Sequence, residues 1–391
     1  MLNMLKKSVC IALIAAVCGC TFVFAEPSTQ VDTEVSAKLV EAKSGILMEQ
    51  TTGEVLYEMN PDERLPIASV TKTMTMLLIM EALDAGKIKL EDMVSVSEYA
   101  ASMGGSQVFL EVGEQMSVQD MLKAIAVASG NDAAVAMAEF ISGSEEAFVE
   151  KMNERAQELG CQNTHFINCN GLDETEEHYS SARDVALISC ELLRHPQILE
   201  YTTIWMDSLR DGQFGLSNTN KLIRFYDGAN GIKTGSTSTA KYCLSASAER
   251  DGMQLVAVVL GAPSTAERFG SATKLLDYGF ANYSVADESI LADTPLTPCR
   301  VVGGTAETVP VEVGGQVNFI VKKGNQQNIE TAVEAEESVN APVEQGEKLG
   351  EIVFSIDGTE VARRDLVAGE TVQRINPLQM FVKMLRQWLA V

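Results

Sequence analysis

The sequence has little of several features that define large classes of protein. Its 391 residues include only eight cysteines, widely scattered, which excludes a scaffold held together by disulfides. Basic residues number 30 against 54 acidic ones, and the formal net charge of -24 argues against nucleic acid as a partner. Three histidines and no G-x-S-x-G sequence leave no support for a Ser-His-Asp triad. The hydrophobic share of 46% is nevertheless that of a folded globular protein, and the length suggests two domains.

Residues 1–25 are predicted to be a signal peptide rather than part of the fold. Lys6 and Lys7 precede a short apolar run that ends at Ala25, as in a secretory signal. No later stretch approaches the roughly 18 unbroken apolar residues of a membrane span. A lipoprotein signal with Cys20 acylated is the alternative. The mature chain is therefore expected outside the cytoplasm, and its five remaining cysteines, an odd number, leave at least one thiol without a partner in the chain.

Residues 37–283 are predicted to form an α+β domain, an antiparallel sheet flanked by helices. A hairpin at residues 42–59 is followed by a helix at residues 70–83 that is apolar on nearly every side, so we expect it to be buried. Further helices are predicted to start at the N-caps Ser117, Ser144 and Ser181. Three successive strands and a last helix are expected at residues 231–237, 242–248, 255–261 and 268–280.

Residues 284–375 are predicted to be a smaller all-β domain, because short strands alternate there with glycine-rich turns. The acidic stretch at residues 330–338 is expected to be a solvated loop. Residues 376–391 form a predicted amphipathic helix with an apolar stripe and the cations Lys383 and Arg386 but no acid. We expect this helix to bind at a membrane surface, and the alternative is a helix docked on its own domain.

Three short motifs combine residues suited to serine chemistry. Ser69 and Lys72 stand three residues apart at the start of the buried helix, so the amine can reach the hydroxyl. The same spacing recurs at Ser238 and Ser271, so by itself it is weak support. The other two motifs are Ser129-Gly130-Asn131 and Lys233-Thr234-Gly235.

Taken in order, the three motifs resemble those of the penicillin-recognising serine enzymes, which carry S-x-x-K, S-x-N and K-T-G. Their spacing is similar to that of the low-molecular-weight branch, the D-alanyl-D-alanine carboxypeptidases. Residues 159–172 and 178–184 also resemble this branch, and so does the β-rich domain. The resemblance runs from about residue 39 to the C-terminus and implies the penicillin-binding/β-lactamase-like fold.

The resemblance also implies a role for each motif residue. Ser69 would be the nucleophile, Lys72 its general base, and Ser129 the group that passes a proton to the departing amine. The substrate would be bound by Asn131, Lys233, Thr234, Gly235, Ser236 and Arg268. Within that set the Ser236 N–H would join the Ser69 N–H in an oxyanion hole, and Arg268 would face the terminal carboxylate.

The activity implied by the resemblance is removal of the terminal D-alanine from peptidoglycan stem peptides, with β-lactams as inhibitors. No cofactor is implied, and Cys161, His165 and Cys169 offer too few ligands to favour a metal site. Ser236 stands where the family often has histidine. Gly130 stands where β-lactamases often have aspartate, and no stretch resembles their deacylating glutamate loop, which favours the carboxypeptidase. The alternatives are a β-lactamase or D,D-endopeptidase, and a non-catalytic penicillin-binding sensor.

Overall fold

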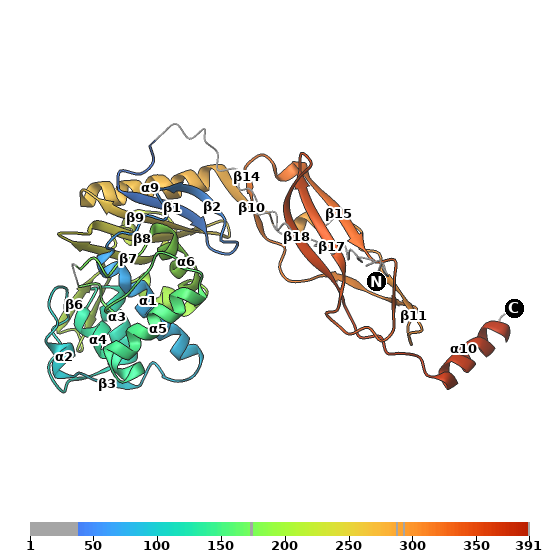
Figure 1. Ribbon diagram of the computed structural model, residues 1–391, viewed down its shortest axis with the longest axis horizontal. Helices are drawn as coiled ribbons and strands as arrows, with labels where there is room; N and C mark the ends of the chain where they lie inside the picture. Colours follow the sequence, from blue (N-terminus) through green and yellow to red (C-terminus); the bar gives the residue numbers. More distant parts are fainter. Residues whose placement is uncertain (1–37, 173–174, 287, 292–293, 390–391) are drawn as a thin grey trace, which may run out of the picture. The chain divides into compact units, whose positions relative to one another are not determined.

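The computed structural model describes residues 38–172, 175–286, 288–291 and 294–389, which are coloured in Figure 1. The predicted signal peptide and Cys20 lie outside the described residues. Among the helices of the described ranges, none is long and apolar enough to cross a membrane. The five cysteines of the described residues are all free thiols, namely Cys161, Cys169, Cys190, Cys243 and Cys299.

A five-stranded antiparallel sheet forms the centre of the larger region, as predicted. Its strand order is β2-β1-β9-β8-β7, so β1 of the N-terminal hairpin pairs with β9, the strand of this sheet that comes last along the chain. Most residues of β8 and β9 are buried, because both faces of the sheet are covered. The strands are β1 (Ser44–Glu49), β2 (Val55–Met59), β7 (Ala229–Thr237), β8 (Lys241–Arg250) and β9 (Met253–Ala262).

Helices cover both faces of this sheet (Figure 1). On one face, α9 packs Leu275, Leu276 and Phe280 onto the sheet. On the other face lies the larger core, which contains α1 and the helices around it. The long helices are α1 (Lys72–Asp84), α3 (Val118–Ala126), α4 (Asn131–Ser142), α5 (Glu145–Glu158), α6 (Ala182–Leu192) and α9 (Thr265–Asn282).

The predicted helix starts are confirmed by their caps. The hydroxyls of Ser117, Ser144 and Ser181 each accept a hydrogen bond from the backbone N–H three residues on. The helix predicted at residues 70–83 is α1, and nine of its 13 residues are buried. Helix α4 was not predicted, because its cap residue is Gly130 and no side chain marks its start.

Shorter elements connect these parts. The short helices are η1 (Ala68–Thr71), α2 (Glu98–Ala101), η2 (Pro196–Ile198), α7 (Leu199–Thr202), α8 (Leu222–Phe225), η3 (Glu288–Leu291) and η4 (Gln326–Asn328). Two small sheets pair β3 (Met93–Ser95) with β4 (Gln115–Ser117) and β5 (Met206–Leu209) with β6 (Phe214–Ser217).

The C-terminal part is β-rich, as predicted, and has its own apolar core. The prediction of a loop at residues 330–338 is wrong, because β15 pairs with β17 in register from Ile329 to Ala335. β15 is the last strand in its sheet, so its carboxylates stay in solvent while the backbone is paired. The strands are β10 (Tyr283–Ala286), β11 (Cys299–Val302), β12 (Thr308–Val309), β13 (Val311–Val313), β14 (Phe319–Lys322), β15 (Ile329–Ala335), β16 (Ser338–Asn340), β17 (Lys348–Ile356) and β18 (Thr359–Ala368).

The predicted C-terminal helix is α10 (Pro377–Leu389). It begins with proline at its first position, and Asn376 and Gln379 exchange side-chain-to-backbone hydrogen bonds of 2.8 and 3.0 Å around that start. Its large apolar side chains between Leu378 and Leu385 are exposed, from 39% for Leu385 to 73% for Leu378. An apolar helix surface of this kind marks a site of interaction.

Candidate active site

Ser69 lies in a tight turn that enters α1. The residue before it, Ala68, has a φ of 49°, an uncommon conformation for alanine. Ser69 is half-buried, whereas both of its neighbours are buried. Strand β7 passes so close that a Cβ on Gly235 would lie 2.6 Å from Ile67 O and 2.9 Å from Ser69 N. Glycine in the third motif is therefore required by the approach of the strand to the turn of the first motif.

The Lys72 amine is fully buried and has three hydrogen-bond acceptors around it. Nζ lies 3.0 Å from Ser69 Oγ, 2.6 Å from Asn131 Oδ1 and 2.6 Å from the main-chain oxygen of Asn170. Burial lowers the pKa of Lys72 to about 7, against weaker upward effects of Cys169 and Asp132. The amide and carbonyl oxygens can only accept, whereas a serine hydroxyl can also donate. A neutral Lys72 that donates to Asn131 and Asn170 therefore points its lone pair at Ser69.

The second motif supplies one of these acceptors. Asn131 Nδ2 donates to Gly104 O at 2.7 Å, which orients the side-chain amide so that its oxygen faces Lys72. Ser129 is buried and has a φ of 62° in the connection between α3 and α4. No hydrogen bond joins its hydroxyl to Lys72 or Lys233 among the described residues.

The third motif lies on β7. Lys233 is buried, and its Nζ donates to Thr234 O at 2.9 Å. Burial, followed by the charges of Lys72 and Arg268, holds the pKa of Lys233 well below its usual range. The Thr234 hydroxyl donates to Thr219 Oγ1 at 2.7 Å. Ser236, two residues further along the strand, is exposed.

Arg268 lies on α9, behind the strand that carries the third motif. Its Nη1 donates to Gly235 O at 3.3 Å and to Cys243 O at 3.4 Å. Its Nε is buried and has no hydrogen-bond partner among the described residues. Burial lowers the pKa of Arg268. Arg268 therefore lies against the backbone of the third motif with one N–H of its guanidinium group without a hydrogen-bond partner among the described residues.

The other two Ser-x-x-Lys copies do not share this geometry. Ser238 lies in the turn between β7 and β8. Ser271 is buried inside α9, where its hydroxyl accepts a hydrogen bond from Glu41 N at 2.9 Å. Only the copy at Ser69 starts a helix among the described residues.

Several residues around the site were missed at the level of sequence. Asn170 contributes a backbone carbonyl, which no side-chain pattern reveals. The Asp132 carboxylate accepts from Val108 N and Leu110 N, at distances of 3.1 to 3.2 Å, and holds that loop to the start of α4. Glu145 accepts from Cys169 N at 2.9 Å, next to Asn170. For Asp132 and Glu145 the sequence does offer a signal. Each acid directly follows a motif residue or a predicted helix cap, at a position that is expected to be buried.

Comparison with known proteins decides the family. Residues 31–264 match the D-alanyl-D-alanine carboxypeptidase family, and residues 288–374 match the C-terminal domain of penicillin-binding protein 5. The chain belongs to the D-alanyl-D-alanine carboxypeptidase family. The predicted serine-type carboxypeptidase activity and the α+β fold with a C-terminal β domain are thereby confirmed.

Relatives cover nearly the whole chain. D-alanyl-D-alanine carboxypeptidase DacF of Bacillus subtilis is 47% identical over 352 residues, which are 89% of this chain and 90% of that one. D-alanyl-D-alanine carboxypeptidase DacC of Escherichia coli is 35% identical over 92% of this chain and 91% of its own. The crystal structure of penicillin-binding protein 5 from Haemophilus influenzae has a TM-score of 0.76 at 33% identity, and covers 86% of this chain and 98% of its own.

A further solved relative shows a bound β-lactam. Penicillin-binding protein D2 from Listeria monocytogenes has been solved in its ampicillin-bound form, and it has a TM-score of 0.57 at 31% identity. It covers 62% of this chain and 99% of its own.

Proposed function

We propose that this carboxypeptidase removes the terminal D-alanine of peptidoglycan pentapeptides through an acyl-enzyme on Ser69. The observation that carries the proposal is the arrangement around Lys72, in which Ser69 is the only one of three hydrogen-bond partners able to give up a proton. The pKa of about 7 leaves a large neutral fraction of Lys72 at neutral pH. Lys72 is therefore the general base.

The first half-reaction forms the acyl-enzyme. The Ser69 proton moves to Lys72 Nζ while Oγ bonds to the carbonyl carbon of the scissile D-Ala-D-Ala bond. The N–H groups of Ser69 and Ser236 stabilise the oxyanion. The protonated Lys72 gives the Ser69 proton to Ser129, which passes its own proton to the departing nitrogen. The C–N bond breaks, D-alanine leaves, and Lys72 is neutral again. In the second half-reaction Lys72 takes a proton from a water molecule while the water oxygen bonds to the ester carbonyl carbon. The bond from that carbon to Ser69 Oγ then breaks, and the proton on Lys72 moves to Oγ and restores the hydroxyl.

The substrate's carboxylate is bound on the side of β7. Lys233 and Arg268 are the two cations next to the backbone of that strand, and Thr234 presents a hydroxyl there. The incoming negative charge favours the ammonium form of Lys233. The pair of lysines then carries its charge on Lys233 and keeps Lys72 as the base. Asn131 holds the amide of the acyl part of the peptide.

Labelling with penicillin tests the assignment of Ser69. Benzylpenicillin is expected to form a covalent adduct on the peptide that contains Ser69, and Ser69→Ala should abolish both this adduct and D-alanine release. Ser238→Ala, in a Ser-x-x-Lys copy outside a helix, is the matched control and should label normally. Mass spectrometry locates the adduct, and an adduct on another serine contradicts the proposal. Steady release of D-alanine separates the carboxypeptidase from a penicillin sensor that acylates and stalls.

The enzyme is also proposed to act at the outer surface of the cytoplasmic membrane through α10. The exposed apolar side chains Leu378, Phe381 and Met384 support this role. Burial of each in the membrane interface would favour binding by about 1.5 kcal/mol or more. The net charge of -24 argues against general attraction to anionic lipid. Deletion of residues 377–391 should release the protein from anionic liposomes in co-sedimentation while D-alanine release persists. Equal sedimentation of both forms would leave acylation of Cys20 as the better hypothesis.

A further inference from the structure

His178 lies buried against the turn that carries Ser69, and its ring bridges two segments of the chain. Nε2 lies 2.7 Å from Thr71 Oγ1, and Nδ1 accepts a hydrogen bond of 3.2 Å from Ile167 N. The Thr71 hydroxyl donates its own proton to Ala68 O at 2.8 Å, so its oxygen accepts from the ring. These bonds assign the proton to Nε2 and leave Nδ1 as the acceptor.

The segment held by His178 wraps around the start of α1. Cys169 O accepts from Thr75 Oγ1 at 2.5 Å, and Asn170 O accepts from Lys72 Nζ at 2.6 Å. At Gly171, with a φ of 77°, a Cβ would lie 1.9 Å from Ala68 O. The same short segment therefore touches the residue before Ser69 and supplies one of the three acceptors of Lys72.

We propose that His178 is a positioning residue for the general base. By tying Ile167 and Thr71 to one ring, it keeps the Asn170 carbonyl on Lys72, so that the lone pair of the neutral amine stays directed at Ser69. The proposal rests on the proposed roles of Ser69 and Lys72. His178 touches neither substrate nor reacting atom and acts on the rate of acylation through Lys72.

Two substitutions separate the halves of the bridge. His178→Gln places an amide N–H donor near the position of Nε2 and keeps the bond to Thr71. His178→Asn places an acceptor near the position of Nδ1 and keeps only the bond to Ile167, and His178→Leu removes both. On the partner side, Thr71→Ser keeps the hydroxyl, whereas Thr71→Val removes it at nearly constant shape.

The experiment measures the acylation of the mature chain by a fluorescent penicillin over a range of concentrations, which gives the acylation rate constant and the Kd separately. Thr71→Ser is expected within about threefold of the wild-type rate constant. His178→Gln and His178→Asn, which each break one side of the bridge, should lose tenfold or more in the rate constant, and so should His178→Leu and Thr71→Val. The Kd should not change, because the residues that bind the ligand lie on α4, β7 and α9.

A double substitution and a control sharpen the result. Since His178 and Thr71 share one bond, the rate lost by the variant with both His178→Leu and Thr71→Val should be smaller than the product of the two single losses. His195→Gln is the matched control, because His195 pairs with Asp84 at the opposite end of α1. It should acylate at the wild-type rate.

The proposal is overturned if His178→Leu acylates as fast as wild type, if His178→Gln and His178→Asn both keep the wild-type rate constant, or if the loss falls on Kd. Thermal unfolding of each variant shows whether it is folded at the assay temperature. If His178→Leu does not fold, His178→Gln and His178→Asn decide the question, because Thr71→Val also removes the bond from Thr71 to Ala68 O. Failure of the Ser69 assignment would appear in the position of the penicillin adduct, and the His178 proposal is judged by relative rates.

Discussion

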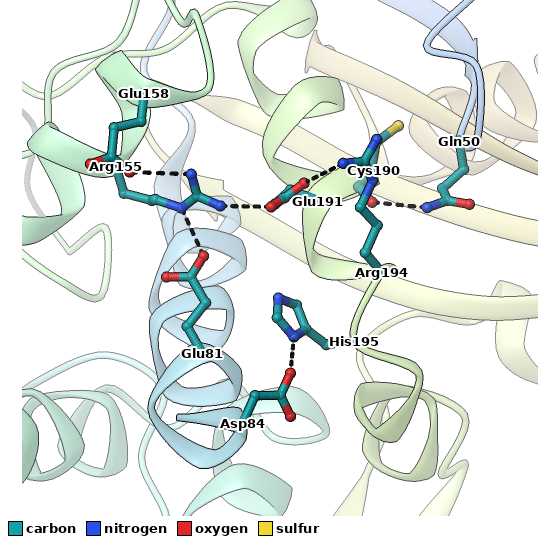
Figure 2. Close-up of polar contacts among 9 residues, drawn as sticks. All are labelled: Gln50, Glu81, Asp84, Arg155, Glu158, Cys190, Glu191, Arg194 and His195. Carbon is teal, nitrogen blue, oxygen red and sulfur yellow. Dashed lines mark hydrogen bonds and ion pairs between the residues drawn. The ribbon is translucent and has the colours of Figure 1, made fainter. Parts of the chain in front are cut away.

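The two ends of α1 handle charge in opposite ways. At its start, the Lys72 amine is fully buried among neutral acceptors. At its end, Glu81 accepts from Arg155 at 2.7 Å, and Asp84 pairs with His195 at 2.5 Å, as Figure 2 shows. Arg155 also bonds Glu191 at 2.6 Å and Glu158 at 3.2 Å, so that it joins α1, α5 and α6. At the start of α1 the Lys72 amine has no carboxylate partner, whereas at the end of α1 each acidic side chain drawn in Figure 2 has a basic partner.

This difference separates a reactive group from a structural one. A pKa of about 7 in place of 10.5 means that the protonated Lys72 destabilises the fold by about 5 kcal/mol at low pH. Burial lowers the pKa of Arg155 too, but its bond to Glu81 and the charges of Glu81, Glu191 and Glu158 reverse the effect and raise it. Charge at the Lys72 end of α1 therefore costs stability, whereas charge at the ion-paired end is stabilised by its partners.

Lys72→Met should break the reactive end with the largest effect. Acylation by penicillin is expected to fall by about 10³-fold or more, because the general base is lost. The free energy of unfolding at pH 6 should rise by about 2 kcal/mol, since removal of the buried charge outweighs the lost hydrogen bonds to Asn131 and Asn170. Stopped-flow acylation and urea denaturation measure the two quantities. Acylation within tenfold of wild type would show that Lys72 is not the base.

The dependence on pH should follow the same lysine. The acylation rate is expected to fall about tenfold for each pH unit below 7, because Lys72 gains a proton, and to level off above pH 7. The folded-state pKa is below the unfolded value, so between pH 7 and 10.5 the unfolded chain binds more protons and stability rises with pH. Wild type should therefore gain stability relative to Lys72→Met over this range. A constant difference between the two proteins from pH 6 to 10 would contradict the assignment.

Arg155→Met should reverse the pattern seen at Lys72. Three carboxylates lose their common partner, so the free energy of unfolding is expected to fall by about 1–3 kcal/mol, discounted for the partial exposure of the network. The acylation rate should stay within about threefold of wild type, because the network is at the far end of the helix. Denaturant unfolding and penicillin acylation test both parts. A hundredfold loss of acylation in a folded variant would mean that the two ends are coupled.

His195→Gln should have the smallest effect. The Asp84 side chain is 59% exposed, so the pair is expected to contribute less than about 1 kcal/mol to stability. A loss well above that value in thermal or denaturant unfolding would place His195 among the essential ties of α1.

The outline of this comparison could be predicted from the sequence, but its causes could not. The spacing of Ser69 and Lys72, and the apolar character of the helix after them, indicated a buried amine beside a hydroxyl. The order of the three motifs indicated which further residues lie around it. The carbonyl of Asn170 has no signature in the sequence, because every residue carries the same group. Helix α4 lacks a capping side chain, and β15 is a strand despite its acids, since an edge position lets them stay in water.

The sequence marks His178 only as one of three histidines without a triad motif and as the first residue of the segment 178–184 that resembles the carboxypeptidase branch. Its observed contacts are with a threonine hydroxyl and a backbone N–H, which are common groups that no motif identifies. Such positioning contacts depend on segments that are distant along the chain and meet only in the fold. Motifs therefore predict the proposed reacting groups, but they do not reveal the residues that orient those groups.

The free thiols have a consequence for life outside the cytoplasm, where this enzyme is proposed to act. Burial raises the pKa of Cys161 to about 12 and of Cys243 to about 11, and it raises those of Cys169, Cys190 and Cys299 as well. The thiolate is the form that oxidants and disulfides attack, so these side chains react slowly although none is paired. Protection against oxidation thus comes from the folded core itself. This protection lasts as long as the core stays closed. The rate at which Cys169 is alkylated would therefore measure how often the chain around Lys72 opens.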